Sequence, residues 1–106
     1  GVRHSDELIY QDLIQELNKN YPSQLSYIRT VTRDKVADCF NYRIPIGIES
    51  RDFQSYANVE INEDSQFMLC GNPEMIKDTS VTLNSFGLKR NRRANPGNIT
   101  VERYWI

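Results

Sequence analysis

The sequence is poor in the residues that build metal centres and disulfide frameworks. Its 106 residues include two cysteines and a single histidine. Cys39 and Cys70 would suffice for one disulfide, but nothing in the pattern demands it. No spacing typical of a zinc site is present. The sequence therefore predicts no metal centre.

Long apolar runs and a dominant charge are also missing. No stretch approaches the length of a membrane span, and no signal-peptide pattern is visible. The formal net charge is −1, which gives no global field favouring nucleic acid or an anionic membrane. We therefore expect a cytoplasmic protein that binds neither nucleic acid nor membranes.

What remains is the composition of an ordinary globular domain. Charged residues make up 25% of the chain and hydrophobic residues 39%. A chain of this length buries roughly 65% of its unfolded surface, which is enough for a modest core. Internal repeats and low-complexity segments are absent, so a single domain is expected.

Alternating helical and strand patterns predict an α/β fold with a parallel sheet. Helices are expected over residues 6–18, 44–49 and 73–86, and strands over residues 25–32, 66–70 and 100–105. Residues 1–3 suit the tail of a further strand. The segments 34–42 and 51–65 lack clear periodicity and are expected to be loops.

The strongest local signal is the junction at residues 70–75. A short apolar run ends at Cys70, which we expect to be buried, and Gly71 permits a tight turn. Asn72 is a favoured helix N-cap, and Pro73 suits the first helical position. Such a junction presents backbone N–H groups to anionic or dinucleotide ligands. An ordinary strand-to-helix turn is the alternative.

Together with Tyr104-Trp105, the run Cys70-Gly71-Asn72-Pro73-x-Met75 resembles the end of bacterial ferredoxin–NADP reductases. These flavoproteins pass a hydride between NADP(H) and FAD, and single electrons between FAD and ferredoxin or flavodoxin. The resemblance covers nearly all of this chain but less than half of such an enzyme. It implies that residues 1–106 are a partial NADP(H)-binding domain.

The resemblance also implies an incomplete Rossmann-like parallel sheet flanked by helices. The family's strand order is 3-2-1-4-5, and this chain lacks both the FAD-binding barrel and the central first strand. Residues 1–3 would be the tail of the second strand. The gap would be filled by an upstream segment, by the FAD-binding lobe or by a second copy of the chain.

Three arginines are candidates for holding the coenzyme's 2′-phosphate, because guanidinium groups bind phosphate through paired donors. By resemblance, Thr32-Arg33 matches a Ser/Thr-Arg pair that binds this phosphate. Arg43 matches an arginine near the adenine and phosphate, and Arg3 matches a basic residue at a strand end. Tyr42 stands where relatives have glycine. The alternative is that these are ordinary solubilising arginines.

The nicotinamide end of the coenzyme would lie at the junction. By resemblance, Cys70 positions the nicotinamide ring against the flavin without covalent chemistry. Gly71 would allow close approach of the backbone, and the helix start would cradle the cofactor through Asn72, Pro73 and Met75. The alternative for Cys70 is a small hydrophobic residue in the core.

Residues near the C-terminus would face the flavin in the intact enzyme. Glu102 would lie near the flavin ring and is, with Cys70, a candidate catalytic residue. Tyr104 and Trp105 would face FAD, although simple packing is the alternative. The cations of Lys89–Arg93 would steer acidic ferredoxin or flavodoxin, or form a solvated face.

Two other functions stay open. An NADH-using relative of the cytochrome b5 reductase type carries a related Cys-Gly-Pro motif but tends to lack the paired arginines. A non-catalytic nucleotide-binding or interaction module would keep the fold without the flavin. If the chain is the NADP(H) lobe, the intact protein is an enzyme and this chain alone is inactive.

Overall fold

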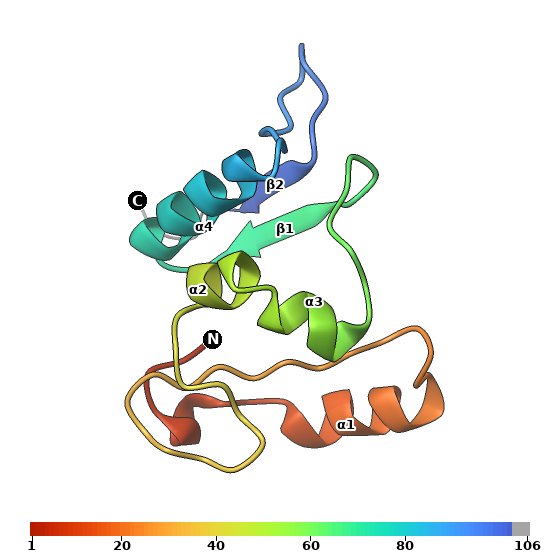
Figure 1. Ribbon diagram of the computed structural model, residues 1–106. Coiled ribbons are helices and arrows are strands. Elements are labelled where there is room, and N and C mark those ends of the chain that lie inside the picture. Colours follow the sequence, from red (N-terminus) through yellow and green to blue (C-terminus); the bar gives the residue numbers. More distant parts are fainter. Residues whose placement is uncertain (103–106) are drawn as a thin grey trace. The chain divides into compact units, whose positions relative to one another are not determined.

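The structure is a computed structural model that describes residues 1–102 (Figure 1). The chain divides into two compact units, Gly1–Asn58 and Val59–Ile106. No helix in the described part is long and apolar enough to cross a membrane. Tyr104 and Trp105 lie outside the described residues.

Helices are the main regular secondary structure of the first unit. A 3-10 turn and three helices follow one another along the chain: η1 (Ser5–Glu7), α1 (Gln11–Asn20), α2 (Ile44–Glu49) and α3 (Asp52–Ala57). Ile48 of α2 is buried, and its carbonyl oxygen accepts a hydrogen bond of 2.9 Å from the Gln54 side chain of α3. The predicted short helix at 44–49 is confirmed.

Parallel pairing in the first unit involves three short segments. The Val2 N–H donates to the Thr30 carbonyl at 2.9 Å, and the Thr32 N–H donates to the Val2 carbonyl at 3.1 Å. On the opposite side, the Val31 N–H donates to the Phe40 carbonyl at 2.8 Å. Val31, between these neighbours, is fully buried. Residues 1–3 therefore pair as the predicted strand end.

The expected strand at 25–32 is wrong over most of its length. Only Thr30 and Val31 form bridges, and residues 25–29 adopt no strand in the structure. Residue type alone favours a strand at 25–29. A strand also needs a paired neighbour, and residues 1–3 are too short to reach that far.

The first helix is also displaced from its expected position at 6–18. The His4 N–H donates to a Glu7 side-chain oxygen at 2.8 Å and closes a separate 3-10 turn. Tyr10 then adopts a left-handed conformation with φ of 57°, so the α-helix starts only at Gln11. Inside the expected loop at 51–65, α3 was missed because six residues are too short to show periodicity.

The second unit contains the predicted strand–helix–strand arrangement. It consists of β1 (Phe67–Cys70), α4 (Pro73–Ser85) and β2 (Ile99–Glu102), and Figure 1 shows α4 beside the two strands. The strands pair in parallel, with Phe67 opposite Ile99 and Cys70 opposite Glu102. Leu83 and Thr79 of α4 are fully buried, as is Ile99 to within 1%. The helix expected at 73–86 is confirmed.

Pairings in both units agree with the strand order that the resemblance implies. Val2 beside Val31 corresponds to strands 2 and 3, and β1 beside β2 to strands 4 and 5. On its other side, β2 is flanked by the segment after α4, since the Asn91 N–H donates to the Ile99 carbonyl at 2.8 Å. Within residues 1–102, β1 has one strand neighbour.

Candidate functional site

Two of the three candidate phosphate-binding arginines are joined through their backbones. The Arg33 N–H donates to the Arg3 carbonyl at 2.8 Å, directly beyond the pairing of Thr32 with Val2. The side chains of Arg3, Thr32 and Arg33 are exposed. Parallel pairing therefore brings these residues, which are distant in sequence, to one edge of the first unit.

Arg43 belongs to the same unit and stands at the start of α2. It is the N-cap residue, with Pro45 within the first two helical positions, and its carbonyl oxygen accepts the Ile46 N–H at 3.0 Å. Two residues earlier, the Asn41 side chain donates to the Val31 carbonyl at 3.1 Å. The chain leading into Arg43 is thus tied to the end of the paired segment.

Tyr42, the residue before Arg43, is held in an aromatic cluster. Its ring stacks on that of Phe40 with centroids 5.4 Å apart, and the Phe53 ring lies 6.2 Å away. The Tyr42 hydroxyl donates to the Asp52 carboxylate. Partial burial and the hydrogen bond to this carboxylate raise the pKa of Tyr42 to about 12. The path of the loop beside Arg43 is therefore set by ring packing.

At the end of β1, the chain turns into α4 as the sequence predicted. Gly71 has φ of 140°, a conformation that side-chain-bearing residues rarely adopt. The Asn72 side-chain oxygen accepts the Glu74 N–H at 2.8 Å and caps the helix that Pro73 opens. The Met75 sulfur accepts a hydrogen bond of 3.5 Å from the Thr79 hydroxyl, one turn further along α4.

Cys70 differs from expectation in one respect. It is exposed rather than buried, because the four residues of β1 alternate between half-buried and exposed and Cys70 falls on the exposed side. Its register partner Glu102 is exposed as well. Both cysteines are free thiols, so the disulfide that the sequence left open is not formed.

A groove of about 650 Å³ in the second unit was not predicted. It runs along one face of α4, whose lining residues recur at three- and four-residue spacings from Pro73 to Asn84. Its cations are Lys77, Arg90 and Arg92, and Ile76 and Ile99 contribute apolar surface. The helical spacing was visible in the sequence, but the position of residues 90–92 opposite α4 depends on their pairing with β2.

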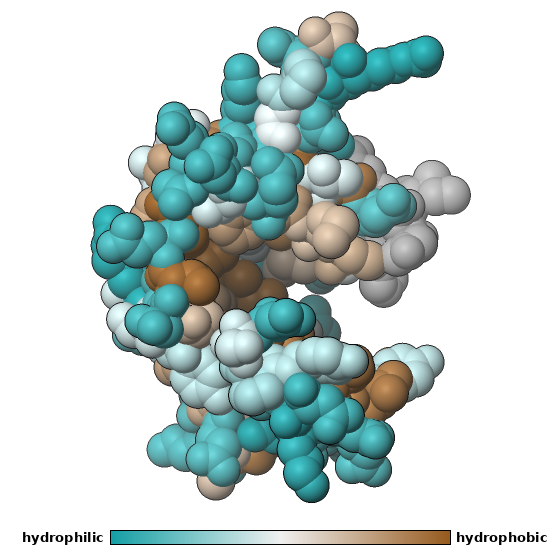
Figure 2. All heavy atoms as spheres, turned by 90° about the vertical axis from the view of Figure 1, so that its right-hand side faces the viewer, coloured by the Kyte–Doolittle hydropathy of each residue, from teal (hydrophilic) through white to brown (hydrophobic). Residues whose placement is uncertain are grey.

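The basic segment Lys89–Arg93 continues from this groove into an exposed turn. Arg92 and Asn95 exchange two backbone hydrogen bonds of 3.0 and 2.9 Å, which close the turn. Figure 2 shows hydrophilic side chains gathered at the top of the view, where Figure 1 places this turn. Among the described residues, no group of three or more His, Cys, Asp or Glu side chains is arranged to hold a metal ion.

Parallel strands followed by helices, with an N-capped helix start and arginines at strand ends, define the class of α/β nucleotide-binding domains. Within this class, the family model described as "Oxidoreductase NAD-binding domain" matches residues 1–81. The chain belongs to this family.

Individual relatives confirm the resemblance to ferredoxin/flavodoxin–NADP reductases. The Flavodoxin/ferredoxin–NADP reductase of Escherichia coli (strain K12) is 38% identical over 99% of this chain and 43% of its own length. The protein of the same name from Buchnera aphidicola subsp. Schizaphis graminum is 37% identical over 99% of this chain and 42% of its own length. The chain therefore spans less than half the length of these relatives.

A solved structure gives the same result for the fold. The crystal structure of a ferredoxin NADP+ reductase from Neisseria gonorrhoeae, with bound FAD and NADP, matches with a TM-score of 0.85 at 29% identity. The match covers 96% of this chain and 41% of that one. The α/β, partly Rossmann-like fold that the sequence predicted is thereby confirmed.

Proposed function

We propose that the chain is the NADP(H)-binding part of a flavoprotein reductase. The intact enzyme would transfer a hydride between NADP(H) and FAD, and single electrons to or from ferredoxin or flavodoxin. The observation that carries the proposal is the backbone hydrogen bond between Arg33 and Arg3. It places two exposed guanidinium-bearing residues side by side in a family whose members use nicotinamide coenzymes.

The adenosine end of NADP(H) would bind to the first unit. Arg33 and Arg43 would grip the 2′-phosphate, with Thr32 donating its hydroxyl and Arg3 supplying further positive charge. Guanidinium groups suit this task because they remain charged and offer several donors in one plane. Tyr42 fixes the backbone that leads into Arg43 through its contact with Phe40.

The nicotinamide end would bind where β1 meets α4. A Cβ at Gly71 would lie 2.9 Å from the terminal carbon of Met75, so glycine at this position leaves room for the Met75 side chain in the turn. Asn72 caps the helix start by accepting the Glu74 N–H, and the positive end of the helix dipole at this start favours anions. Cys70 and Glu102 would contact and orient the reacting rings. When bound, NADP(H) and FAD supply the hydride chemistry itself.

FAD would be held mainly outside this chain, with Tyr104 and Trp105 facing it. The pure chain should accordingly be colourless and should not reduce an artificial acceptor with NADPH. A yellow preparation with diaphorase activity would contradict the assignment of the flavin to another lobe.

The basic surface around residues 89–93 would bind the electron-carrier protein. Lys89, Arg90, Arg92 and Arg93 lie together beyond α4, and Lys77 adds a cation across the groove. Acidic carriers such as ferredoxin or flavodoxin would be steered to such a surface, and their association would weaken with rising salt. A separate partner would fill the sheet beside β1. This partner would be either the FAD-binding lobe or a second copy of the chain.

The paired arginines favour this function over an NADH-using reductase of the cytochrome b5 reductase type. A charged hydrogen bond contributes roughly 1.5–3 kcal/mol, so two arginines would supply about 3–5 kcal/mol of preference for the phosphorylated coenzyme. That corresponds to a preference on the order of 10²–10³-fold or more. A non-catalytic binding module would also prefer NADP(H), but the full-length protein would then show no reductase activity.

Coenzyme titration tests the proposal. NADP(H) and NAD(H) would be titrated against the full-length flavoprotein carrying this chain and its Arg33→Ala and Arg43→Ala variants. Lys19→Ala, which removes one exposed charge from the last turn of α1, is the matched control. Both arginine variants should lose preference for NADP(H), whereas the control should keep it. Unchanged preference in both would refute the phosphate-site assignment.

A further inference from the structure

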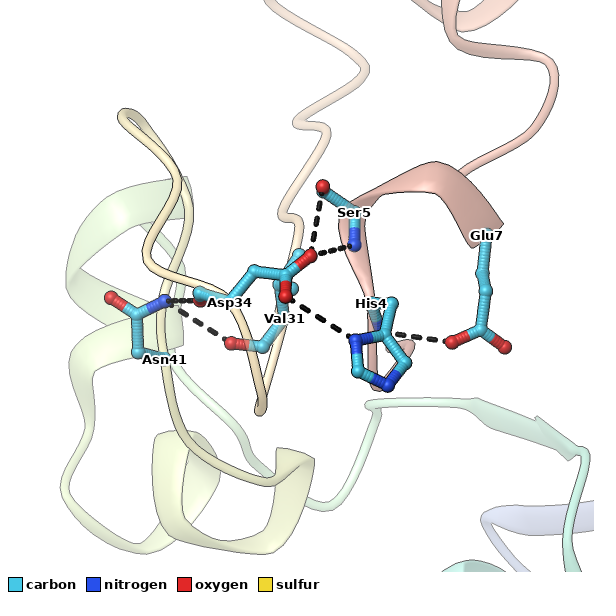
Figure 3. A network of polar contacts seen from close by, with 6 residues as sticks. All are labelled: His4, Ser5, Glu7, Val31, Asp34 and Asn41. Atoms are coloured by element: carbon cyan, nitrogen blue, oxygen red, sulfur yellow. Dashed lines mark hydrogen bonds and ion pairs between the residues drawn. The ribbon is translucent and has the colours of Figure 1, made fainter.

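Asp34 joins the ends of the two paired segments that carry Arg3 and Arg33. One carboxylate oxygen accepts hydrogen bonds from the Ser5 backbone N–H at 2.7 Å and from the Ser5 hydroxyl at 2.9 Å. The other oxygen lies 3.3 Å from Nδ1 of His4. Figure 3 shows the carboxylate facing Ser5 and His4 together. The residue after Arg33 therefore binds the two residues that follow Arg3.

Asn41 makes the corresponding connection toward Arg43. Its side-chain nitrogen donates to the Asp34 carbonyl at 2.8 Å and to the Val31 carbonyl at 3.1 Å (Figure 3). Both acceptors lie next to the Arg33 region, and the donor lies two residues before Arg43. One hydrogen-bonded network thus connects the three segments that carry the candidate arginines.

The position of Asp34 is unfavourable if only its charge is considered. Hydrogen bonds from Ser5 lower the pKa of the Asp34 carboxyl, followed by the contact with His4, so it is ionised at neutral pH. An ionised carboxylate beside a phosphate site repels the anion and competes for the guanidinium groups. The negative charge of Asp34 therefore opposes phosphate binding, whereas its hydrogen bonds to Ser5 hold the segments of Arg3 and Arg33 together.

We propose that Asp34 and Asn41 are positioning residues that hold the segments of Arg3, Arg33 and Arg43 in the arrangement that recognises a 2′-phosphate. This inference rests on the proposed function and deepens it. Neither side chain touches the coenzyme. They act through the backbone, so that the arginine side chains start from fixed positions and lose less freedom when the phosphate binds.

The charge of Asp34 and its hydrogen bonds have opposite effects on phosphate binding, so they predict opposite results for Asp34→Ala. Loss of a nearby negative charge alone would strengthen binding of a phosphate. Loss of the network would weaken it, because hydrogen bonds to a charged group are lost and the segments are released. Asp34→Asn separates the two effects further, since its amide oxygen still accepts from Ser5 but carries no charge.

The experiment compares 2′,5′-ADP with ADP, which lacks the 2′-phosphate, by calorimetric titration of the full-length flavoprotein that carries this chain. Asp34→Ala should weaken 2′,5′-ADP binding about tenfold and ADP binding by less than about threefold. Asp34→Asn should restore 2′,5′-ADP binding to within about threefold of the unsubstituted chain. Glu16→Ala, which removes an exposed acid of α1, should change neither affinity.

Two further variants keep the test decisive if Asp34→Ala does not fold. Ser5→Ala removes one of the hydrogen bonds to Asp34, and Asn41→Ala removes both bonds made by the amide; each should weaken 2′,5′-ADP more than ADP. The inference is overturned if 2′,5′-ADP binds the variants as tightly as it binds Glu16→Ala, or if both nucleotides weaken equally. If the unsubstituted chain itself does not prefer 2′,5′-ADP to ADP, the proposed function fails instead.

Discussion

Cys70 and Glu102 occupy the same register position at the ends of the parallel strands β1 and β2. Both residues are exposed, so a thiol just before the turn into α4 and a carboxylate at the end of β2 stand on neighbouring strands. They are far apart in the sequence, and although the expected strand order places their strands side by side, it does not give the register. Only the parallel register of the two strands makes them neighbours.

The exposure of Cys70 predicts its reactivity. Iodoacetamide should modify Cys70 faster than the half-buried Cys39, as measured by mass spectrometry of tryptic peptides over time. Cys70→Ser should remove the fast phase and Cys39→Ser should leave it. If the nicotinamide binds as proposed, NADP+ should slow the fast phase in the full-length flavoprotein. Equal rates for both cysteines would contradict the structure at this strand end.

Gly71→Ala should destabilise the second unit more than Gly87→Ala. Both glycines have positive φ, 140° and 83°, so both substitutions strain the backbone. At Gly71, φ of 140° lies well outside the left-handed region that residues with a side chain can enter, and the new Cβ would also displace the flexible end of Met75 at 2.9 Å; at Gly87, φ is closer to that region and nothing lies within 4 Å. We expect a loss of about 1–2 kcal/mol at Gly87 and a larger loss at Gly71, measured by urea unfolding.

A double variant separates the two causes of the loss at Gly71. In Gly71→Ala, the additional substitution Met75→Ala should recover the part of the loss that is due to contact but not the part due to φ. Recovery to the full stability of the unsubstituted chain would mean that the φ of Gly71 carries no cost.

Local signals explain why the α4 region was predictable and much of the first unit was not. Asn72, Pro73 and Gly87 specify the ends of α4 through contacts within a few residues. Whether residues 25–29 form a strand depends instead on whether a neighbouring strand is present to pair with them. The bond between Asp34 and Ser5 joins polar residues with no periodic pattern, so the network beside the arginines was invisible in the sequence.

Alkaline pH should affect the first unit through Tyr42. The pKa of Tyr42 is raised from 10.0 to about 12 in the folded protein, so the neutral form is favoured on folding. Its contribution to stability is therefore complete below the unfolded pKa of 10.0 and is lost as pH rises toward about 12. Unfolding by urea across this range should show a steeper loss in the unsubstituted chain than in Tyr42→Phe.

Tyr21→Phe provides the control for this measurement, since Tyr21 is exposed and outside the aromatic cluster. It should follow the unsubstituted chain at every pH. In a spectroscopic titration of tyrosine ionisation, Tyr42→Phe should lack the component that titrates at the highest pH. If all three proteins lose stability in parallel, the hydrogen bond from Tyr42 to Asp52 does not persist in solution.

The edge of β1 that faces away from β2 should pair with another strand. The Phe67 N–H donates to the Asn98 carbonyl at 2.8 Å, toward β2, so the backbone groups of Met68 alternate to the opposite edge. Met68 is also 87% exposed, which leaves its apolar side chain uncovered. Unpaired strand edges favour association, so an ordered chain should carry either an upstream segment or a second copy at this edge.

Sedimentation combined with intact mass distinguishes these two occupants. If the mass matches residues 1–106, the chain should sediment as a dimer or larger species, and Met68→Pro should shift it toward monomer because the open edge loses a donor. Met68→Lys, which keeps the backbone N–H, should associate more strongly than the proline variant. A mass larger than the chain with monomeric sedimentation would identify an upstream segment as the occupant. An ordered monomer of only these residues with a collapsed or reordered sheet would show that the strand order 3-2-1-4-5 does not hold for this protein.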